Sequence, residues 1–214
     1  MQDNPYQRYY YDGTYVLKNK LDIADGNDLH AFEYEWSASQ LPEALAYARS
    51  ASVLDGSALQ GVHRILLGDI YDWAGELRKI PMSKGELEFL HPVTADAVNE
   101  VFKAFAQNTA IDRPNRNDVA AQLARLWGDL NYAHPLVESN GRATQLMLTV
   151  IAERSDWTID WASVSKSDET YAGVASCVLD LGDQRFDGFR DILLNALQPN
   201  RKPDPHDDLD KGNL

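Results

Sequence analysis

Apolar residues recur at steps of three or four positions along most of this chain, and this spacing restricts the fold more than any other feature. Between residues 57 and 75, for example, Leu59, Val62, Leu66 and Ile70 keep to it. Residues at such steps lie on one face of an α-helix, which then packs against a core. The same reasoning predicts helices over residues 27–38, 41–51, 57–75, 94–107, 117–133, 141–154, 167–181 and 187–198.

The segment 76–92 departs from the helical pattern. Apolar residues alternate in part on either side of Ser83, Lys84 and Gly85, a turn-forming stretch, and this predicts a short β-hairpin. Pro81 cannot donate a hydrogen bond to a neighbouring strand, so its strand is expected at an edge. The chain is therefore predicted to form an all-α domain, a compact helical bundle with one short β-hairpin.

Length and composition fit one domain with short appendages. The chain has 214 residues, of which 44% are hydrophobic, and this is enough for a core at this length. We expect an irregular, tyrosine-rich N-terminal extension over 1–13 and the helical domain over 14–198. The segment 199–214 is rich in charge and proline, which predicts a disordered acidic tail.

Charge and cysteine content narrow the classes of function. The net charge is −13 and the sequence supplies no basic face, so a nucleic-acid partner is not expected. No segment has signal-peptide character or the apolar length to cross a membrane, and no membrane partner is expected. The single cysteine, Cys177, cannot form a disulfide within the chain, which favours a reducing compartment. These features predict a cytoplasmic protein, although delivery into another cell as an effector would leave no trace by these rules.

Residues 134–145, HPLVESNGRATQ, place reactive groups directly before the most uniformly apolar of the predicted helices. A helix N-terminus exposes unpaired N–H groups and the positive end of the dipole, and Asn140 and Gly141 leave room there for a phosphate. Glu138 is a carboxylate of the kind that holds Mg²⁺ together with nucleotide phosphates. His134 titrates near neutrality and can take a proton from a hydroxyl.

Arg142 adds a cation to the first turn of that helix. The helix dipole disfavours a cation at this end, unless an anion lies nearby. Each of these groups alone also fits a structural loop or a helix cap, and it is their combination that points to phosphate chemistry. His30 and His63 fall inside predicted helices and are interpreted as surface or core groups.

This loop resembles the motif of the Fic family. That motif runs histidine, any residue, phenylalanine, any residue, Asp or Glu, Gly-Asn-Gly-Arg, then two residues and a second arginine. The likeness covers roughly residues 5 to 197. It includes TYVLKNKLDI, similar to the segment that opens many Fic domains, and VHRILLGDIYDWAGELRKIPMSKG, similar to the family's helix and flap hairpin. The residues on matching motif positions are His134, Glu138, Asn140, Gly141 and Arg142.

The resemblance implies transfer of AMP from ATP to a hydroxyl side chain of a target protein. His134 would act as the base, Glu138 would hold Mg²⁺ at the phosphates, and Arg142 would clamp the phosphates. An anion hole would stabilise the charge that develops during transfer, lined by Ser139, Asn140 and Gly141. The flap would align the target by strand addition through Ile80, Pro81, Met82, Ser83, Lys84 and Gly85.

Three residues depart from the motif. Leu136 replaces the phenylalanine, an apolar exchange of modest cost. Ser139 replaces the first glycine, so its Cβ crowds the phosphate or forces a different turn. Gln145 takes the place of the second arginine at the nucleotide, and loss of such a charge-assisted contact costs roughly 1.5–3 kcal/mol.

These departures leave several outcomes open. ATP binding is weakened, or a different nucleotide or phosphate donor is used, or the domain is degenerate and acts as a binding or regulatory module. The phosphotransfer branch of the family carries lysine at the position of Gly141, so this glycine favours nucleotidyl transfer over phosphoryl transfer.

Fic proteins are commonly restrained by a helix that carries Ser or Thr, three residues, Glu, then Gly or Asn. Ser39–Ala44 and Ser165–Thr170 match this pattern in part, each with a different final residue. A separate small inhibitory chain, as in a toxin-antitoxin pair, is the alternative partner. The usual blocking pair needs the second arginine, so with Gln145 any inhibition would depend on another contact.

Overall fold

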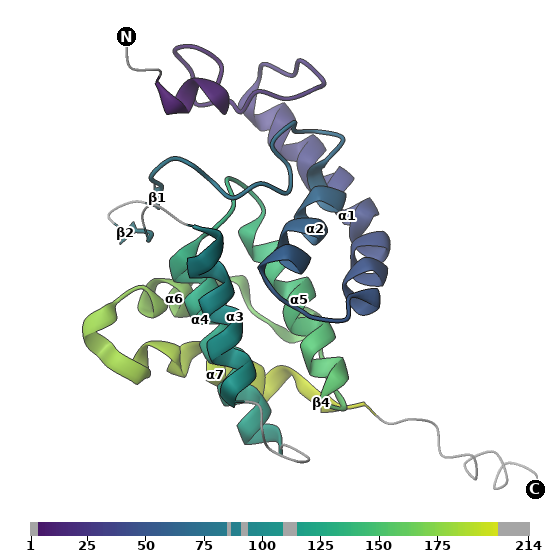
Figure 1. Cartoon of the computed structure of the whole chain (residues 1–214), viewed down its shortest axis with the longest axis vertical. Helices are drawn as coiled ribbons and strands as arrows, with labels where there is room; N and C mark the ends of the chain where they lie inside the picture. Colours follow the sequence, from purple (N-terminus) through teal and green to yellow (C-terminus); the bar gives the residue numbers. More distant parts are fainter. Residues whose placement is uncertain (1–3, 85–86, 91–93, 109–114, 201–214) are drawn as a thin grey trace, which may run out of the picture.

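The structure is a computed structural model that describes residues 4–84, 87–90, 94–108 and 115–200 (Figure 1). Within these ranges the chain is mostly helical, and the predicted fold class is confirmed. The helices are α1 (Gly26–Ser50), α2 (Gly56–Leu67), α3 (Ala95–Asn108), α4 (Arg116–Ala133), α5 (Asn140–Arg154), α6 (Lys166–Ser176) and α7 (Asp187–Ala196), with 3-10 helices η1 (Pro5–Arg8), η2 (Trp161–Ser163) and η3 (Leu179–Phe186). The strands are β1 (Ser83–Lys84), β2 (Leu87–Glu88), β3 (Trp157–Ile159) and β4 (Leu197–Pro199).

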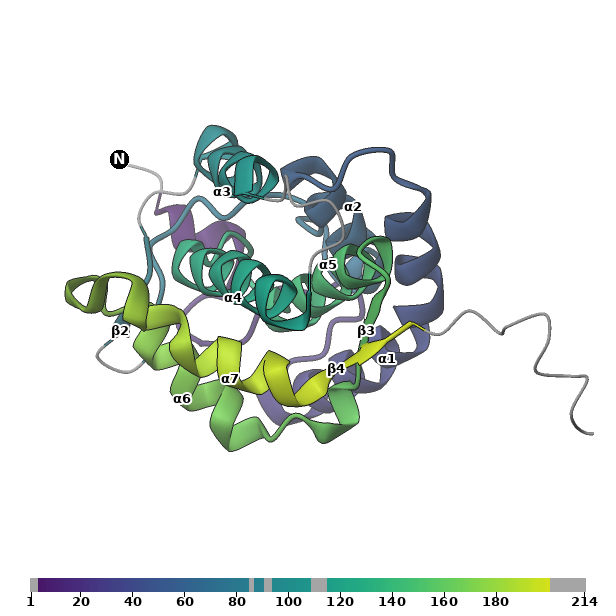
Figure 2. The ribbon, with the colours of Figure 1, turned by 90° about the horizontal axis from the view of Figure 1, so that it is seen from below.

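Two helices, α4 and α5, form the centre of the bundle. Figure 2 shows them with the other helices around them: α1 and α2 contact α5, whereas α3, α6 and α7 contact α4. On α5, Ala143, Met147, Leu148 and Ala152 are fully buried. The prediction that this apolar helix lies at the centre of the fold is therefore confirmed, and its N-terminus is held by neighbours on several sides.

The predicted hairpin is present and short. Ser83 pairs with Glu88 and Lys84 pairs with Leu87 in an antiparallel arrangement, and the predicted turn residue Gly85 lies outside the described residues. A second antiparallel pair, β3 with β4, was not predicted. Because Leu197–Pro199 belongs to this pair, the last helix ends at Ala196 rather than at residue 198.

The prediction of separate helices over 27–38 and 41–51 is wrong, because α1 runs unbroken from Gly26 to Ser50 with Pro42 inside it. A proline in a helix interior removes one backbone hydrogen bond and crowds the preceding turn. Tertiary packing offsets this cost. Tyr47 lies so close over Gly61 of α2 that a Cβ there would collide with its ring.

The prediction that the next helix reaches Gly75 is also wrong, since α2 ends at Leu67. The apolar spacing continues past this point because Ile70 and Trp73 are buried, although they lie in turns. Gly75 has a φ of +83°, and its N–H donates to Nδ1 of His63 at 2.8 Å. The chain thus folds back onto α2 instead of extending it.

Other predicted helix boundaries shift as well, most of them by a single residue. The predicted helix over 117–133 begins one residue earlier, at Arg116, and its cap is Asn115, whose side chain accepts from the N–H of Asp118 at 3.1 Å. The predicted helix over 167–181 ends at Ser176, and η3 follows after a short gap.

The N-terminal segment packs on the helical bundle. Tyr9 is buried and lies edge-on against Trp73, and Tyr10 forms an isolated antiparallel bridge with Leu17. The predicted disordered tail falls, from residue 201 onward, outside the described residues. No helix in the described ranges has both the length and the apolar character needed to span a bilayer.

Candidate active site

The loop from His134 to Ser139 joins α4 to α5. His134 ends α4 in the left-handed region, with a φ of +42°, and its N–H donates to the carbonyl of Leu130 at 2.9 Å. Asn140 then closes the loop in both directions. Its Oδ1 accepts from the N–H of Leu136 at 2.9 Å, and its Nδ2 donates to the carbonyl of Leu136 at 2.8 Å. The loop is therefore fixed before any ligand binds.

The N-terminus of α5 has the properties of an anion site. Ser139 occupies the cap position with a φ of +55°, yet its side chain makes no capping hydrogen bond to the helix. The space in front of Gly141 is open, since a Cβ built there would meet nothing within 4 Å. First-turn N–H groups that are not capped attract anions. The loop thus presents them to solvent at a position without a side chain.

Ser139 shows how the chain tolerates a residue other than glycine in the motif. Its left-handed backbone is one that L residues rarely adopt. Its hydroxyl donates to Oε1 of Glu33 at 3.3 Å, which directs the side chain back into the protein. Ser139 is itself buried, so its hydroxyl faces Glu33 and not the solvent in front of α5.

Glu33 of α1 is a buried carboxylate that sequence reasoning missed. It accepts a hydrogen bond from the Tyr71 hydroxyl at 2.9 Å and lies 3.5 Å from Nη2 of Arg142. Burial raises the pKa of Glu33, and the charge of Glu138 raises it further, whereas Tyr71, Arg142 and Ser139 act in the opposite direction. The carboxylate is thus a shared acceptor beneath the anion site.

Arg142 lies in the first turn of α5, as predicted, but its guanidinium faces α1. Nη1 donates to the Ser37 hydroxyl and to the backbone carbonyl of Glu33, the latter at 3.4 Å. Its side chain remains 24% exposed. The carboxylate of Glu33 therefore compensates the positive charge of Arg142 at this end of the helix. A phosphate could reach the exposed part of the guanidinium.

His63 of α2 lies beneath the same loop and was predicted only as a surface or core group. It is fully buried, and burial lowers its pKa from 6.5 to about 4. The backbone carbonyl of Glu138 favours the protonated ring, but the nearby charge of Arg142 opposes it. A neutral imidazole therefore supports the loop at physiological pH.

Glu138 is half-buried and points toward the start of α5. Its Oε1 accepts from the N–H of Ser139 at 2.8 Å. No group of three or more His, Cys, Asp and Glu side chains that could hold a metal ion occurs in the part of the chain that the structure describes. Mg²⁺ commonly takes one or two carboxylates and draws its other ligands from water and substrate phosphates. A single carboxylate beside an open anion site fits that pattern.

His134 presents its ring at the rim of the loop. The ring is half-buried and stacks on Phe89, with 3.8 Å between the ring centroids and 9° between the planes. Phe89 follows β2 directly, so the imidazole and the hairpin are in contact. Movement of the hairpin would therefore change the position of the imidazole of His134, the predicted base.

Arg78 is the second positioning group that sequence reasoning missed. Its buried guanidinium donates to the backbone carbonyls of His134 and Ile80, each at 2.6 Å, and also to those of Leu90 and Ala133. Burial lowers its pKa. One side chain thus ties the end of α4 to both ends of the hairpin.

The predicted flap residues do not all face outward. Ile80 is 1% exposed and belongs to the core, Met82 is half-buried, and Pro81 and Ser83 are exposed. Lys84 is in β1. Among these residues, Pro81 and Ser83 offer a surface to a partner, whereas Ile80 anchors the hairpin.

Gln145 lies one turn farther along α5 and does not join the Arg142 cluster. Its Nε2 donates to Oε1 of Glu169 on α6 at 3.2 Å. Oε2 of Glu169 pairs with Lys166 at 3.0 Å. Glu169 belongs to Ser165–Thr170, one of the segments that partly match the inhibitory pattern.

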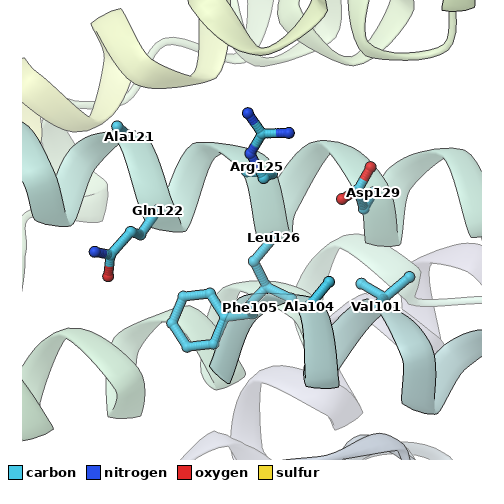
Figure 3. A pocket seen from close by; sticks show the side chains of 8 residues that line it. All are labelled: Val101, Ala104, Phe105, Ala121, Gln122, Arg125, Leu126 and Asp129. Carbon is cyan, nitrogen blue, oxygen red and sulfur yellow. The ribbon is translucent and has the colours of Figure 1, made fainter. Parts of the chain in front are cut away.

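A separate hollow of about 140 Å³ lies between α3 and α4 (Figure 3). It is lined by apolar side chains such as Phe105 and Leu126, with Arg125 and Asp129 at its side. None of the predicted site residues is among the residues that line it.

The geometry above defines a helical fold in which residues 134–139, a candidate anion-binding loop called the anion loop below, precede the central helix. Comparisons with known proteins identify the family. The Fic/DOC family profile matches residues 53–152. A protein of Sinorhizobium fredii called "Probable protein adenylyltransferase y4lH" is 32% identical over 152 residues, which is 70% of this chain and 77% of that protein. The chain therefore belongs to the Fic family.

Solved structures agree on the fold. The Fic domain of the effector Bep8 from Bartonella sp. 1-1C has a TM-score of 0.80 at 16% identity, covering 92% of this chain and 98% of that one. BepC from Bartonella tribocorum, solved with bound AMPPNP, has a TM-score of 0.72 at 22% identity, covering 91% and 98%. At these identities the likeness establishes the arrangement of helices around the loop.

Proposed function

We propose that this protein transfers AMP from ATP to a hydroxyl side chain of a target protein. The observation that carries the proposal is the N-terminus of α5, which has no side-chain cap, is open in front of Gly141 and is joined to His134 by the short loop between α4 and α5. Relatives that are called protein adenylyltransferases, together with the AMPPNP bound to BepC, support an adenine nucleotide as the donor. A small inhibitory chain remains a second predicted partner.

Each group has a role that follows from its position. The first N–H groups of α5 would bind phosphate oxygens and stabilise the negative charge that grows as the α-phosphate is attacked. The Asn140 side chain is committed to Leu136, so its contribution would come from its backbone N–H. Arg142 would reach the phosphates with the exposed part of its guanidinium.

His134 would take the proton of the target hydroxyl, because it lies at the rim of the loop and its ring is fixed against Phe89. Glu138 would hold Mg²⁺, which supplies positive charge that offsets the charge of the phosphates. The exposed residues of the hairpin would align the target backbone beside His134.

The test is intact-mass spectrometry after incubation with Mg²⁺ and each nucleoside triphosphate in turn. An AMP adduct on the protein or an added target, lost in His134→Ala, is the expected result. His30→Ala is the matched control, because His30 is an exposed histidine on α1. Equal adducts in wild type and His134→Ala would refute catalysis by this loop, and a different adduct mass would identify another donor.

A degenerate Fic domain is the second candidate, and the Gln145–Glu169 contact favours it. The amide of Gln145 already donates to the carboxylate of Glu169. The negative charge of this carboxylate would repel a triphosphate bound nearby. This candidate predicts that AMPPNP binds weakly, or binds without any transfer from ATP. Isothermal titration alongside the mass experiment separates the two.

A further inference from the structure

A hollow of about 470 Å³ lies between the N-terminal segment and the hairpin. One wall is formed by the tyrosines Tyr6, Tyr10, Tyr11 and Tyr15 together with Asp12, and the other by Pro81, Met82 and Ser83. Its volume is within the range of about 300–1,000 Å³ that is typical of ligand sites.

The segment that carries the tyrosine wall is anchored to the protein at Tyr9, next to the wall residue Tyr10. Tyr9 is buried against Trp73, and its hydroxyl accepts from the N–H of Lys79 at 3.3 Å, next to the start of the hairpin. The N–H of Thr14 donates to the carbonyl of Tyr11 at 3.1 Å, which closes a turn. The contact between Tyr9 and Lys79 therefore holds this segment beside the start of the hairpin.

The hollow lies close to the candidate active site. Burial raises the pKa of Tyr10, and the charge of Glu138 is the next contribution to that increase. Tyr10 thus lines the hollow and interacts electrostatically with the carboxylate of Glu138. A chain lying along Ser83 of β1 would lie beside this hollow, because Ser83 is one of its lining residues.

The charge of the hollow selects its occupant. Among the described residues that line it, Asp12 is the one side chain that carries a charge at neutral pH. Two neighbouring cations already have protein partners: Arg8 pairs with Glu76 at 2.6 Å, and Lys18 donates to the backbone carbonyl of the lining residue Gln7 at 2.6 Å. Tyrosine faces and a carboxylate together favour an ammonium or guanidinium group. A nucleobase would stack on the rings but carries no charge for Asp12.

We infer that this hollow receives a lysine or arginine side chain of the target polypeptide while the target backbone lies along β1. The inference rests on the proposed function, because it names the kind of target that the same site modifies. The overall charge of −13 also favours a basic target segment.

The experiment measures binding without nucleotide, so that it does not depend on transfer. Two dye-labelled peptides, identical except for lysine or its neutral isostere norleucine on either side of a central threonine, are titrated with the full chain by fluorescence anisotropy. The lysine peptide should bind about three- to tenfold more tightly. Tyr6→Ala should remove about two- to fivefold of that preference, and Tyr6→Phe should retain it, because the ring face attracts the cation.

Asp12→Asn tests the role of the carboxylate in the hollow. Asp69→Asn is its control, because it removes the same charge from an exposed position outside the hollow. Only Asp12→Asn should weaken binding of the lysine peptide, and neither variant should change the affinity for the norleucine peptide. Equal binding of both peptides, or equal effects of the two variants, overturns the inference. In a separate titration, adenosine is added to wild type and to Tyr6→Ala. If Tyr6→Ala bound adenosine more weakly but kept the preference for the lysine peptide, the hollow would belong to the nucleotide and the inference would be overturned. Lysine preference without any AMP adduct would refute the proposed function alone.

Discussion

Oε1 of Glu33 on α1 and Nη2 of Arg142 on α5 lie 3.5 Å apart, although 109 residues separate them in the chain. The same carboxylate accepts hydrogen bonds from Tyr71 and Ser139, so it connects α1, the chain after α2 and the anion loop. Removal of one partner from a buried ion pair leaves the other charge uncompensated, which is more costly than the pair's net contribution. Glu33 is therefore expected to be essential to the loop.

Glu33→Ala should lower the free energy of unfolding by about 3–5 kcal/mol, because the hydroxyl of Tyr71 would lose its acceptor and the partly buried guanidinium of Arg142 would lose its carboxylate partner. Glu33→Gln retains an acceptor oxygen and should cost less, about 1–3 kcal/mol. Urea denaturation followed by circular dichroism measures both. Glu35→Ala, an exposed glutamate on the same helix, is the control and should change stability by less than about 0.5 kcal/mol. Similar losses at the two positions would show that the buried carboxylate does not hold the loop.

Substitution of Arg78 should affect the positioning of His134 and the hairpin without affecting nucleotide binding. Arg78→Lys removes the planar fork that reaches four carbonyls, and an ammonium cannot bind the same set. We expect the rate of AMP transfer to fall at least about tenfold as His134 and the hairpin lose their fixed relation, a barrier change of about 1.4 kcal/mol. The dissociation constant of ATP should change by less than about threefold, since the guanidinium of Arg78 donates to the end of α4 and to the hairpin and not to the N-terminus of α5.

The control for this substitution is Arg190→Lys, which alters an exposed arginine paired with Asp187. It should leave both quantities unchanged. A proportional loss of nucleotide binding and transfer in Arg78→Lys would mean that the substitution disturbs the fold as a whole, and the positioning role would be abandoned.

His63 makes stability depend on pH in a stated direction. The folded imidazole has a pKa of about 4, whereas the unfolded one titrates near 6.5. Between these values the unfolded chain binds more protons, so the free energy of unfolding should fall as the pH drops from 6.5 toward 4, by on the order of 3 kcal/mol in all. His63→Asn keeps an acceptor for the N–H of Gly75 but does not titrate, so its stability should fall less over this window.

Glu33 acts in the opposite direction, because a raised pKa makes the folded state take up its proton first. The comparison of wild type with His63→Asn at each pH cancels this contribution. Urea midpoints measured from pH 7 to pH 4.5 provide the profile. Parallel profiles for the two proteins would show that His63 is not held neutral.

The sequence predicted those features that depend on residues near one another in the chain. The spacing of Leu59, Val62 and Leu66 defines a helix face locally, and the loop from His134 is a contiguous motif. Pro42 misled the prediction because packing against α2 outweighs the propensity of one residue.

The groups behind the loop could not be predicted in this way. Glu33 and Arg78 reach the loop from 106 and 56 residues away, to Ser139 and to His134, and no local pattern marks a buried ion or a buried guanidinium. A glutamate at an apolar-face position of a predicted helix was the one available signal for Glu33. The pair β3 and β4 is too short for alternation to be recognised, and its partner strands lie far apart in the chain.

The contact between Gln145 and Glu169 changes what restoring the motif arginine should do. Glu169 is 15% exposed and shares its carboxylate with Lys166. An arginine introduced by Gln145→Arg would meet this carboxylate before it meets a phosphate. We therefore expect Gln145→Arg alone to lower the KM for ATP by less than about threefold, while a new partly buried ion pair raises thermal stability slightly.

The double variant Gln145→Arg with Glu169→Ala should lower that KM about tenfold or more, because the guanidinium then has no protein partner and is available for a charge-assisted contact. Gln145→Arg with Asp168→Ala is the matched control, since Asp168 is an exposed acid on the same helix and its removal changes the net charge equally. If the single variant already matched the double, the carboxylate of Glu169 would not restrict this position. The partial match at Ser165–Thr170 would then be coincidental, and Gln145 alone would account for any weak binding of ATP.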